Sequence, residues 1–169
     1  MKIHLYLKVF PPAGGPLLDG TSRAVNGLAS GLTALGQEVT VVCEGQEDSL
    51  RKSGSAYEIR CLAHPGSAAR AGSLRFSTPP GLREYLVANL PDLALLNGFF
   101  NPHVYAYSRI FNEQGIPYVS VPHNPYDSGA FGRKTLFKWS YWYMFERRVL
   151  KQARAVQWLD ERQAGEPLG

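Results

Sequence analysis

Short apolar runs alternate along the chain with longer segments of helical periodicity. The first run, residues 2–10, predicts a strand because apolar side chains recur at every second position. The apolar members are Ile3, Leu5, Leu7 and Val9. Residues 21–35 predict a helix, with Thr21 as its cap and Gly36 as its stop, and residues 38–43 predict a second, buried strand. The two strands should therefore be parallel and joined by a right-handed crossover.

The same alternation continues to the end of the chain. Further strands are predicted at 57–62, 93–96, 116–121 and 155–159, and further helices at 81–90, 101–114 and 133–151. Residues 46–54 are polar and predict a surface loop, whereas 63–77 fit either a long loop or one poor helix. We expect an α/β fold with a doubly wound, mainly parallel sheet and helices on both faces, which is a Rossmann-like architecture. A helical pattern begins again after residue 159, so we expect a fragment or one lobe of a larger enzyme.

Composition restricts the class of protein. The chain has 169 residues, 44% of them hydrophobic, and a net charge of +4. These numbers suit about one globular domain. No apolar run reaches the ~18 residues of a membrane span, and the start lacks a signal-peptide core. Cys43 and Cys61 have no metal-binding spacing and are expected to pack as small hydrophobes in a reducing cytosol.

Three loops should meet at the carboxyl edge of the predicted sheet, where open α/β folds bind their ligands. They are residues 11–20, 97–101 and 122–132. Gly20 directly precedes the first helix, so backbone N–H groups and the helix dipole there suit a phosphate or diphosphate. The alternative is that the glycines of this loop only permit a tight connection.

Histidine supplies the main candidate chemistry. His123 follows the fifth strand between two prolines, where it can contact a phosphate or sugar oxygen or exchange a proton. The alternative is a loop histidine that bonds a nearby carbonyl. His4 is expected to be structural, His64 to be a solvated loop residue, and His103 could face the site from the first turn of a helix. The sequence contains no zinc-binding pair, serine-hydrolase elbow or paired carboxylates, so no metal site is predicted.

The predicted helix at 133–151 is both aromatic and basic. One stripe that can face the sheet comprises Trp139, Trp142, Tyr143, Val149 and Leu150. A second stripe comprises Phe137, Tyr141, Met144 and Phe145, beside Lys134, Lys138 and Arg148. This second stripe could be covered by another lobe or helix, or could rest on an anionic bilayer. No nucleic-acid-binding module is present, so nucleic acid is not expected as a partner.

Two segments resemble a known family. Residues 19–42 are similar to a turn, an amphipathic helix and a strand of one lobe of its members. Residues 122–124 with 134–156 are similar to a loop of that lobe and the helix that follows it. The family is the GT-B-fold glycosyltransferases, specifically the retaining enzymes of family 4, and the resemblance is to their amino-terminal lobe. Asp19, Gln37 and Asn124 depart from the family's usual Gly, His and Gly.

The resemblance implies that residues 1–169 form the acceptor-side lobe, with the donor-binding carboxyl-terminal lobe absent from this chain. The whole enzyme would transfer a hexosyl-type group from a nucleotide-diphosphate sugar to a sugar or lipid-linked acceptor, with retention and without a metal or other cofactor. Gly20, or alternatively Gly15, would approach the donor diphosphate, and His123 would be catalytic. The acceptor side would be lined by Asn97, Asn124, Tyr126, Arg133 and Lys134.

The resemblance also implies a location and leaves rival functions open. We expect a cytoplasmic protein, with attachment to the inner face of the membrane as an open alternative. The isolated lobe should be inactive. The rivals are a non-catalytic α/β ligand-binding or interaction module and a different nucleotide-dependent α/β enzyme.

Overall fold

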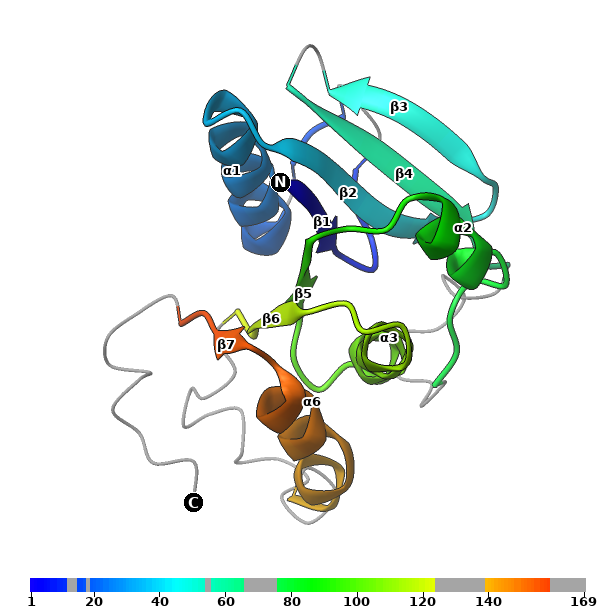
Figure 1. The fold of residues 1–169 in the computed structure, drawn as a ribbon, viewed down its shortest axis with the longest axis vertical. Helices are drawn as coiled ribbons and strands as arrows, with labels where there is room; N and C mark the ends of the chain where they lie inside the picture. Colours follow the sequence, from blue (N-terminus) through cyan, green and yellow to red (C-terminus); the bar gives the residue numbers. More distant parts are fainter. Residues whose placement is uncertain (12–14, 18, 54–55, 66–75, 124–138, 159–169) are drawn as a thin grey trace.

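A seven-stranded sheet forms the centre of the molecule (Figure 1). The computed structural model describes residues 1–11, 15–17, 19–53, 56–65, 76–123 and 139–158. The strands run in the order β3-β4-β2-β1-β5-β6-β7. Their bounds are β1 Lys2–Tyr6, β2 Glu38–Gly45, β3 Ser49–Ser53, β4 Tyr57–Ala63, β5 Leu93–Asn97, β6 Tyr118–Val121 and β7 Ala155–Val156.

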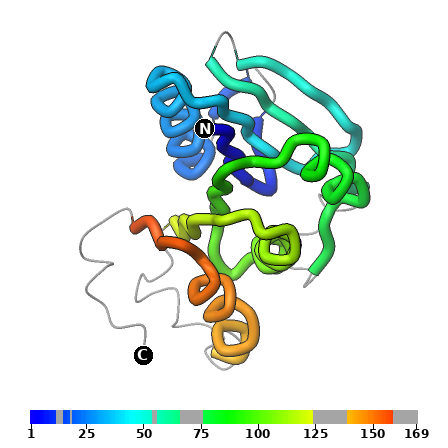
Figure 2. Tube along the Cα trace, in the orientation of Figure 1, coloured from blue at the N-terminus to red at the C-terminus, as the bar shows by residue number. Residues whose placement is uncertain are grey.

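Helices cover both faces of this sheet (Figures 1 and 2). They are α1 Gly20–Ala34, α2 Leu82–Ala88, α3 Pro102–Glu113, the π-helix η2 Trp142–Glu146, and α6 Arg147–Gln152. Val25 and Ala29 of α1 join one apolar cluster, whereas α2, α3 and α6 contribute to a second cluster. This two-layered core confirms the predicted doubly wound α/β fold. No helix among the described residues is long and apolar enough to cross a membrane.

All strand pairs except β3–β4 are parallel. Leu5 of β1 is in register with Val41 of β2 on one side and with Leu95 of β5 on the other. The chain leaves β1 toward α1 on one face and leaves β5 toward α3 on the other face. The carboxyl ends of β1 and β5 therefore flank the point where the strand order reverses, which is the usual ligand crevice of such sheets.

Two local features differ from the predictions. Residues 46–54 do not form only a surface loop, because β3 pairs antiparallel with β4 at the edge of the sheet. Its exposed, mostly polar side chains carry no burial pattern, which is typical of an edge strand. The cap of α1 is Asp19 and not Thr21, since the Asp19 carboxylate accepts the Ser22 backbone N–H at 2.8 Å.

The predicted face of the aromatic helix is also partly wrong. Trp142 and Val149 are buried as expected, but Trp139 and Tyr143 are 42% and 55% exposed, and Tyr141 is buried instead. The reason is η2, because a π-helix has more residues per turn than an α-helix and shifts the faces on either side of it. Phe137, Lys134 and Lys138 lie outside the described residues.

Candidate active site at the carboxyl edge

His123 and Asn97 meet at the carboxyl edge of the sheet. Asn97 is the last residue of β5, and His123 is the second residue after β6. The Asn97 Oδ1 and His123 Nε2 atoms are 2.8 Å apart. Asn97 also bonds the carbonyl of Tyr6, the last residue of β1. Two of the predicted ligand loops thus meet beside the end of β1, at the reversal of strand order.

The hydrogen bonds of Asn97 define the state of the His123 ring. The Asn97 amide Nδ2 donates to the carbonyls of Tyr6 and Leu95, at 3.0 and 3.4 Å. The amide oxygen is therefore the atom directed at His123 and can only accept. Nε2 of His123 must carry a proton, and in the neutral ring Nδ1 is left to accept a hydrogen bond from a ligand.

Burial favours the neutral form of this ring. Desolvation lowers the pKa of His123 below its usual value, and the negative charge of Asp19 opposes that shift. Asp19 is the residue just before α1 and belongs to the third predicted loop. Its effect on the pKa of His123 shows that this loop also lies near the histidine. His123 also has a left-handed backbone, with φ of 46°. Such a conformation in a non-glycine residue costs free energy and is common at functional sites.

The amino end of α1 is less open to an anion than the sequence suggested. Both carboxylate oxygens of Asp19 accept hydrogen bonds from Ser22, from its N–H at 2.8 Å and its hydroxyl at 2.6 Å. These bonds lower the pKa of Asp19, so a negative charge already occupies the cap. Gly20 is exposed with open space around its Cα, and Gly15 is half-buried. The predicted phosphate contact at these glycines stays a prediction.

The loop between β5 and α3 is held in an unusual conformation. Gly98 has φ of 128°, which side-chain-bearing residues rarely adopt, and Phe100 has φ of 50°. The Phe100 backbone N–H donates to the carboxyl group of Glu146 in η2. Burial is the larger effect and raises the pKa of Glu146 to about 8. Rings of Phe99 and Trp142 also pack together, with centroids 5.9 Å apart.

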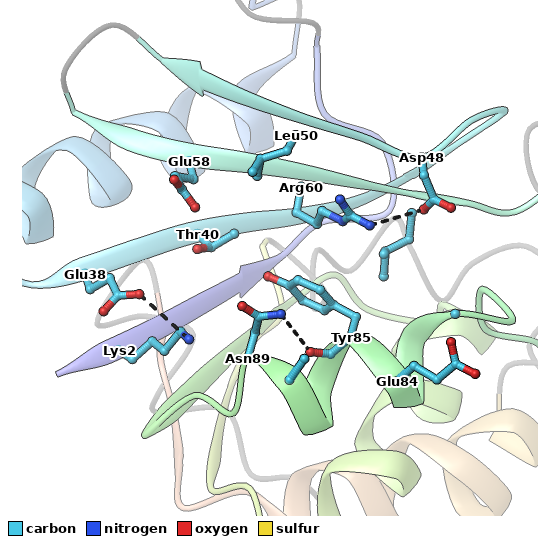
Figure 3. Close-up of a pocket in the computed structure, with 13 residues that line it drawn as sticks. Lys2, Glu38, Thr40, Asp48, Leu50, Glu58, Arg60, Glu84, Tyr85 and Asn89 are labelled. Atoms are coloured by element: carbon cyan, nitrogen blue, oxygen red, sulfur yellow. Dashed lines mark hydrogen bonds and ion pairs between the residues drawn. The ribbon is translucent and has the colours of Figure 1, made fainter.

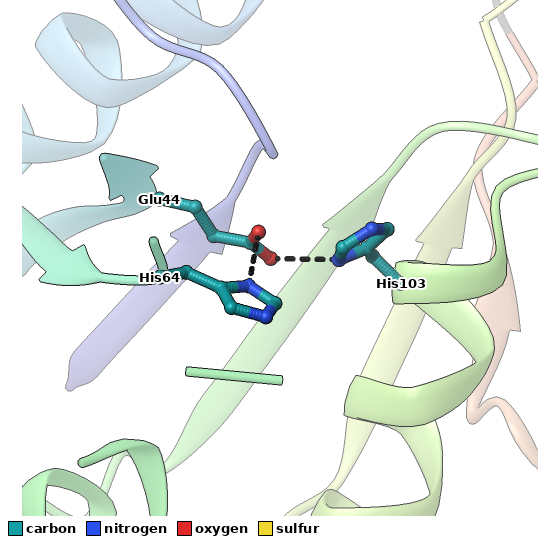
Figure 4. A group of neighbouring side chains, drawn as sticks. All are labelled: Glu44, His64 and His103. Atoms are coloured by element: carbon teal, nitrogen blue, oxygen red, sulfur yellow. Dashed lines mark hydrogen bonds and ion pairs between the residues drawn. The ribbon is translucent and has the colours of Figure 1, made fainter. Parts of the chain in front are cut away.

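A second polar cluster lies at the same edge and was missed from the sequence (Figure 4). Glu44, near the end of β2, bonds the Nδ1 atoms of His64 and His103 at 2.8 and 3.2 Å. His64 is therefore not the solvated loop residue that we expected, because its side chain is only 12% exposed. Each of the three residues lies at a strand end or a helix start, and this shared position was the signal in the sequence that could have pointed to the cluster.

The cavity drawn in Figure 3 lies elsewhere. It has a volume of about 400 Å³ and lies beside α2, extending from Lys2 and Glu38 at the amino ends of β1 and β2 to Leu62 near the carboxyl end of β4. Arg60 and Asp48 form an ion pair on its wall, with 3.7 Å between their charged atoms. Asn97 and His123 are not among the described residues that line it.

Several predicted site residues lie outside the described part of the chain. They are Asn124, Tyr126, Arg133 and Lys134. Of the remaining predicted residues, the structure brings Asn97 and His123 into direct contact, with Asp19 of the first loop nearby.

Comparison with known proteins agrees with this architecture. The family model described as Glycosyltransferase Family 4 matches residues 18–157. The fold is similar to that of sucrose-phosphate synthase from Thermosynechococcus elongatus, with a TM-score of 0.65 and 14% sequence identity over 97% of this chain. The chain spans 44% of the length of that protein. No curated protein sequence matches it.

Proposed function

The chain belongs to glycosyltransferase family 4, and on that premise we propose that it is the acceptor-side lobe of a retaining hexosyltransferase. The donor would be a nucleotide-diphosphate sugar, and the acceptor a hydroxyl group of a sugar or of a lipid-linked sugar. A second, carboxyl-terminal lobe would hold the nucleotide. This proposal is supported by the family match and by the polar groups gathered where the strand order reverses.

The contact between Asn97 and His123 carries the proposal. With Nε2 bound to Asn97, a neutral His123 presents Nδ1 as an acceptor for a hydroxyl of the transferred sugar. A protonated ring would instead donate from Nδ1 to a phosphate oxygen. The lowered pKa of His123 favours the first role near neutral pH. In either role the ring would stabilise and orient the donor as the glycosidic bond to the diphosphate breaks.

The departing diphosphate would be stabilised by backbone N–H groups at Gly20, or alternatively at Gly15, and by basic groups. Asp19 opposes this because its carboxylate caps the same helix. A diphosphate could bind there with the help of the second lobe, whose cations would offset the charge of Asp19. We propose that neither a metal nor another cofactor is needed for the transfer step.

The acceptor would bind beside Asn97, along the loop predicted at residues 122–132. We assign Asn124, Tyr126, Arg133 and Lys134 to this side. A lipid-linked acceptor would make an anionic membrane surface a partner, reached by the exposed Trp139 and Tyr143 of the aromatic helix. The protein would then act in the cytoplasm, at the inner face of the membrane.

The test uses a protein that contains this lobe and its carboxyl-terminal partner. It is incubated with a panel of nucleotide-diphosphate sugars and candidate acceptors, and release of nucleotide diphosphate is measured. The anomeric configuration of the product is then read by NMR. Transfer with retention supports the proposal, whereas inversion would overturn the mechanism.

The isolated 169-residue chain provides the matched control. It should release no nucleotide diphosphate above background, because the donor lobe is missing. If the two-lobed protein also binds a sugar or nucleotide without any turnover, the alternative of a non-catalytic α/β binding module is the better description.

A further inference from the structure

We propose that Glu44, His64 and His103 bind a divalent transition-metal ion, with Zn²⁺ as the ion that best fits the donor set. Each residue offers one donor atom, and the three atoms all lie within 4.8 Å of one another (Figure 4). Ligands about 2.0–2.2 Å from a tetrahedral zinc ion lie about 3.3–3.6 Å apart. Small side-chain adjustments would therefore place an ion between them.

The chemistry of the donors selects this class of ion. Two imidazoles and one carboxylate form the ligand set of many catalytic zinc sites, which keep a fourth position for water or a substrate. Ca²⁺ and Mg²⁺ prefer oxygen ligands alone and would not suit two histidines. Glu44 and His103 are buried, with exposed fractions of 8% and 2%. The site is thus enclosed and differs from a surface histidine pair that collects metal adventitiously.

Two further side chains orient the ligands. The Tyr6 hydroxyl donates to Oε1 of Glu44 at 2.8 Å, so the carboxylate is held in place. The Ser77 hydroxyl oxygen lies 3.2 Å from Nε2 of His64. Without a metal, Nδ1 donates to Glu44 and Nε2 accepts from Ser77. In the metal-bound form Nε2 would carry the proton and donate to Ser77, which leaves the lone pair of Nδ1 for the ion. Such outer partners are typical of metal-binding histidines, whose orientation and tautomer they fix.

The three ligands come from separate elements. Glu44 lies near the end of β2, His64 directly follows β4, and His103 is in the first turn of α3. An ion held by all three would tie α3 to the ends of β2 and β4. Because α3 directly follows the loop at residues 98–101, the metal would also stabilise one wall of the proposed sugar crevice.

The proposal is tested by metal binding to the purified 169-residue chain and does not depend on glycosyl transfer. The chain is first treated with a chelator and then titrated with ZnCl₂ in a calorimeter. We expect one ion per chain and a higher melting temperature, since a ligand that binds only the folded state stabilises it. Cobalt substitution should give the visible absorption bands of a four- or five-coordinate site.

Variants separate this site from other imidazoles. His64→Gln and Glu44→Gln should each lower the zinc affinity by at least 100-fold, and Tyr6→Phe by about 10- to 100-fold. His64 is the safest change because it is partly exposed, and circular dichroism checks the fold. His123→Ala is the matched control and should leave the affinity unchanged. The proposal would be overturned if zinc does not bind stoichiometrically. It would also be overturned if the zinc affinities of His64→Gln and Glu44→Gln both stay within threefold of the wild-type value.

Discussion

The imidazole of His123 is hydrogen-bonded to the side chain of Asn97, with 2.8 Å between Nε2 and Oδ1, although the residues are 26 positions apart. Asn97 is the last residue of β5, and His123 follows the neighbouring parallel strand β6. Since the Asn97 amide is oriented by backbone carbonyls, the sheet itself determines which nitrogen of His123 carries the proton. A ligand in the crevice would therefore meet Nδ1.

Replacing His123 by Ala should lower the turnover of the two-lobed enzyme about 10- to 1,000-fold, the range expected for a positioned polar group at a developing charge. The free energy of unfolding should fall by only about 1 kcal/mol, the typical net value of one hydrogen bond. Steady-state kinetics and thermal unfolding would measure the two effects.

Asn97→Ala serves as the comparison for His123→Ala. It removes the hydrogen-bond acceptor but leaves the imidazole, so turnover should fall less than in His123→Ala. Wild-type turnover in a well-folded His123→Ala protein would assign the histidine to a structural role in its loop.

Substitutions of Asp19 separate its two effects, the capping of α1 and the negative charge near His123. Asp19→Asn keeps an oxygen that can accept from Ser22, whereas Asp19→Ala removes it and should cost about 1 kcal/mol of stability. Both changes remove the negative charge, so the pKa of His123 should fall further in each. NMR titration of the imidazole in the isolated chain would measure this.

The same two variants test the diphosphate contact at Gly20. If a diphosphate binds at the amino end of α1, Asp19→Asn should lower the KM for the donor several-fold in the two-lobed enzyme, because a like charge is removed. An unchanged KM in a protein with the expected shift of the His123 pKa would place the diphosphate elsewhere.

Glu146 should make the stability of the chain depend on pH. Its pKa is about 8 in the folded state, compared with 4.5 for an ordinary glutamate side chain. Between these values the folded state binds the extra proton, so the free energy of unfolding should fall as pH rises from 5 to 8. The slope for one proton is about 1.4 kcal/mol per pH unit. Urea unfolding at several pH values would measure it.

Glu146→Gln should flatten this dependence and exceed the wild type in stability at pH 8, since a neutral amide has no charge to desolvate. Glu113→Gln is the control because Glu113 is exposed and its pKa is lowered by Arg83. A slope that Glu146→Gln leaves unchanged would contradict a buried, protonated Glu146.

The main layers of the fold were predictable because short apolar runs alternate with longer segments of helical periodicity. Val25 and Ala29 of α1 pack in one apolar cluster with Ile3 and Leu5 of β1, whose residues from Ile3 to Tyr6 are all buried. β3 escaped prediction because an exposed edge strand buries little. The π-helix escaped because the prediction assumed regular α-helical spacing through residues 142–146.

The site was only partly predictable for a related reason. Strand ends identified His123 and Asn97, because parallel strands deliver their exit loops to one edge. The cluster of Glu44, His64 and His103 depends on distances between side chains that are 20 to 59 positions apart. Spacing along the sequence does not reveal such contacts, and the place of these residues at strand ends and a helix start was the signal available.

The exposed face of the aromatic helix now differs from the one expected to meet a membrane. Tyr141 is buried and Phe145 packs on Phe76, with ring centroids 4.5 Å apart. Trp139 and Tyr143 are exposed instead, and the guanidinium of Arg147 lies 6.0 Å from the centre of the Tyr143 ring. A membrane contact would therefore use these three residues.

We expect the isolated chain to sediment with vesicles of anionic lipid at low salt and to be released as salt is raised. Lys151 is exposed in the last turn of α6, the helix that begins at Arg147. Each basic residue near such a surface contributes about 1 kcal/mol, so Arg147→Glu with Lys151→Glu should abolish binding. Trp139→Ala with Tyr143→Ala should weaken it by removing apolar contact. Val87→Ala, an exposed apolar position on α2, is the control and should bind as the wild type does. If the wild-type chain stays in the supernatant at low salt, the membrane contact is wrong, and the exposed aromatics are best explained as the docking surface for the second lobe.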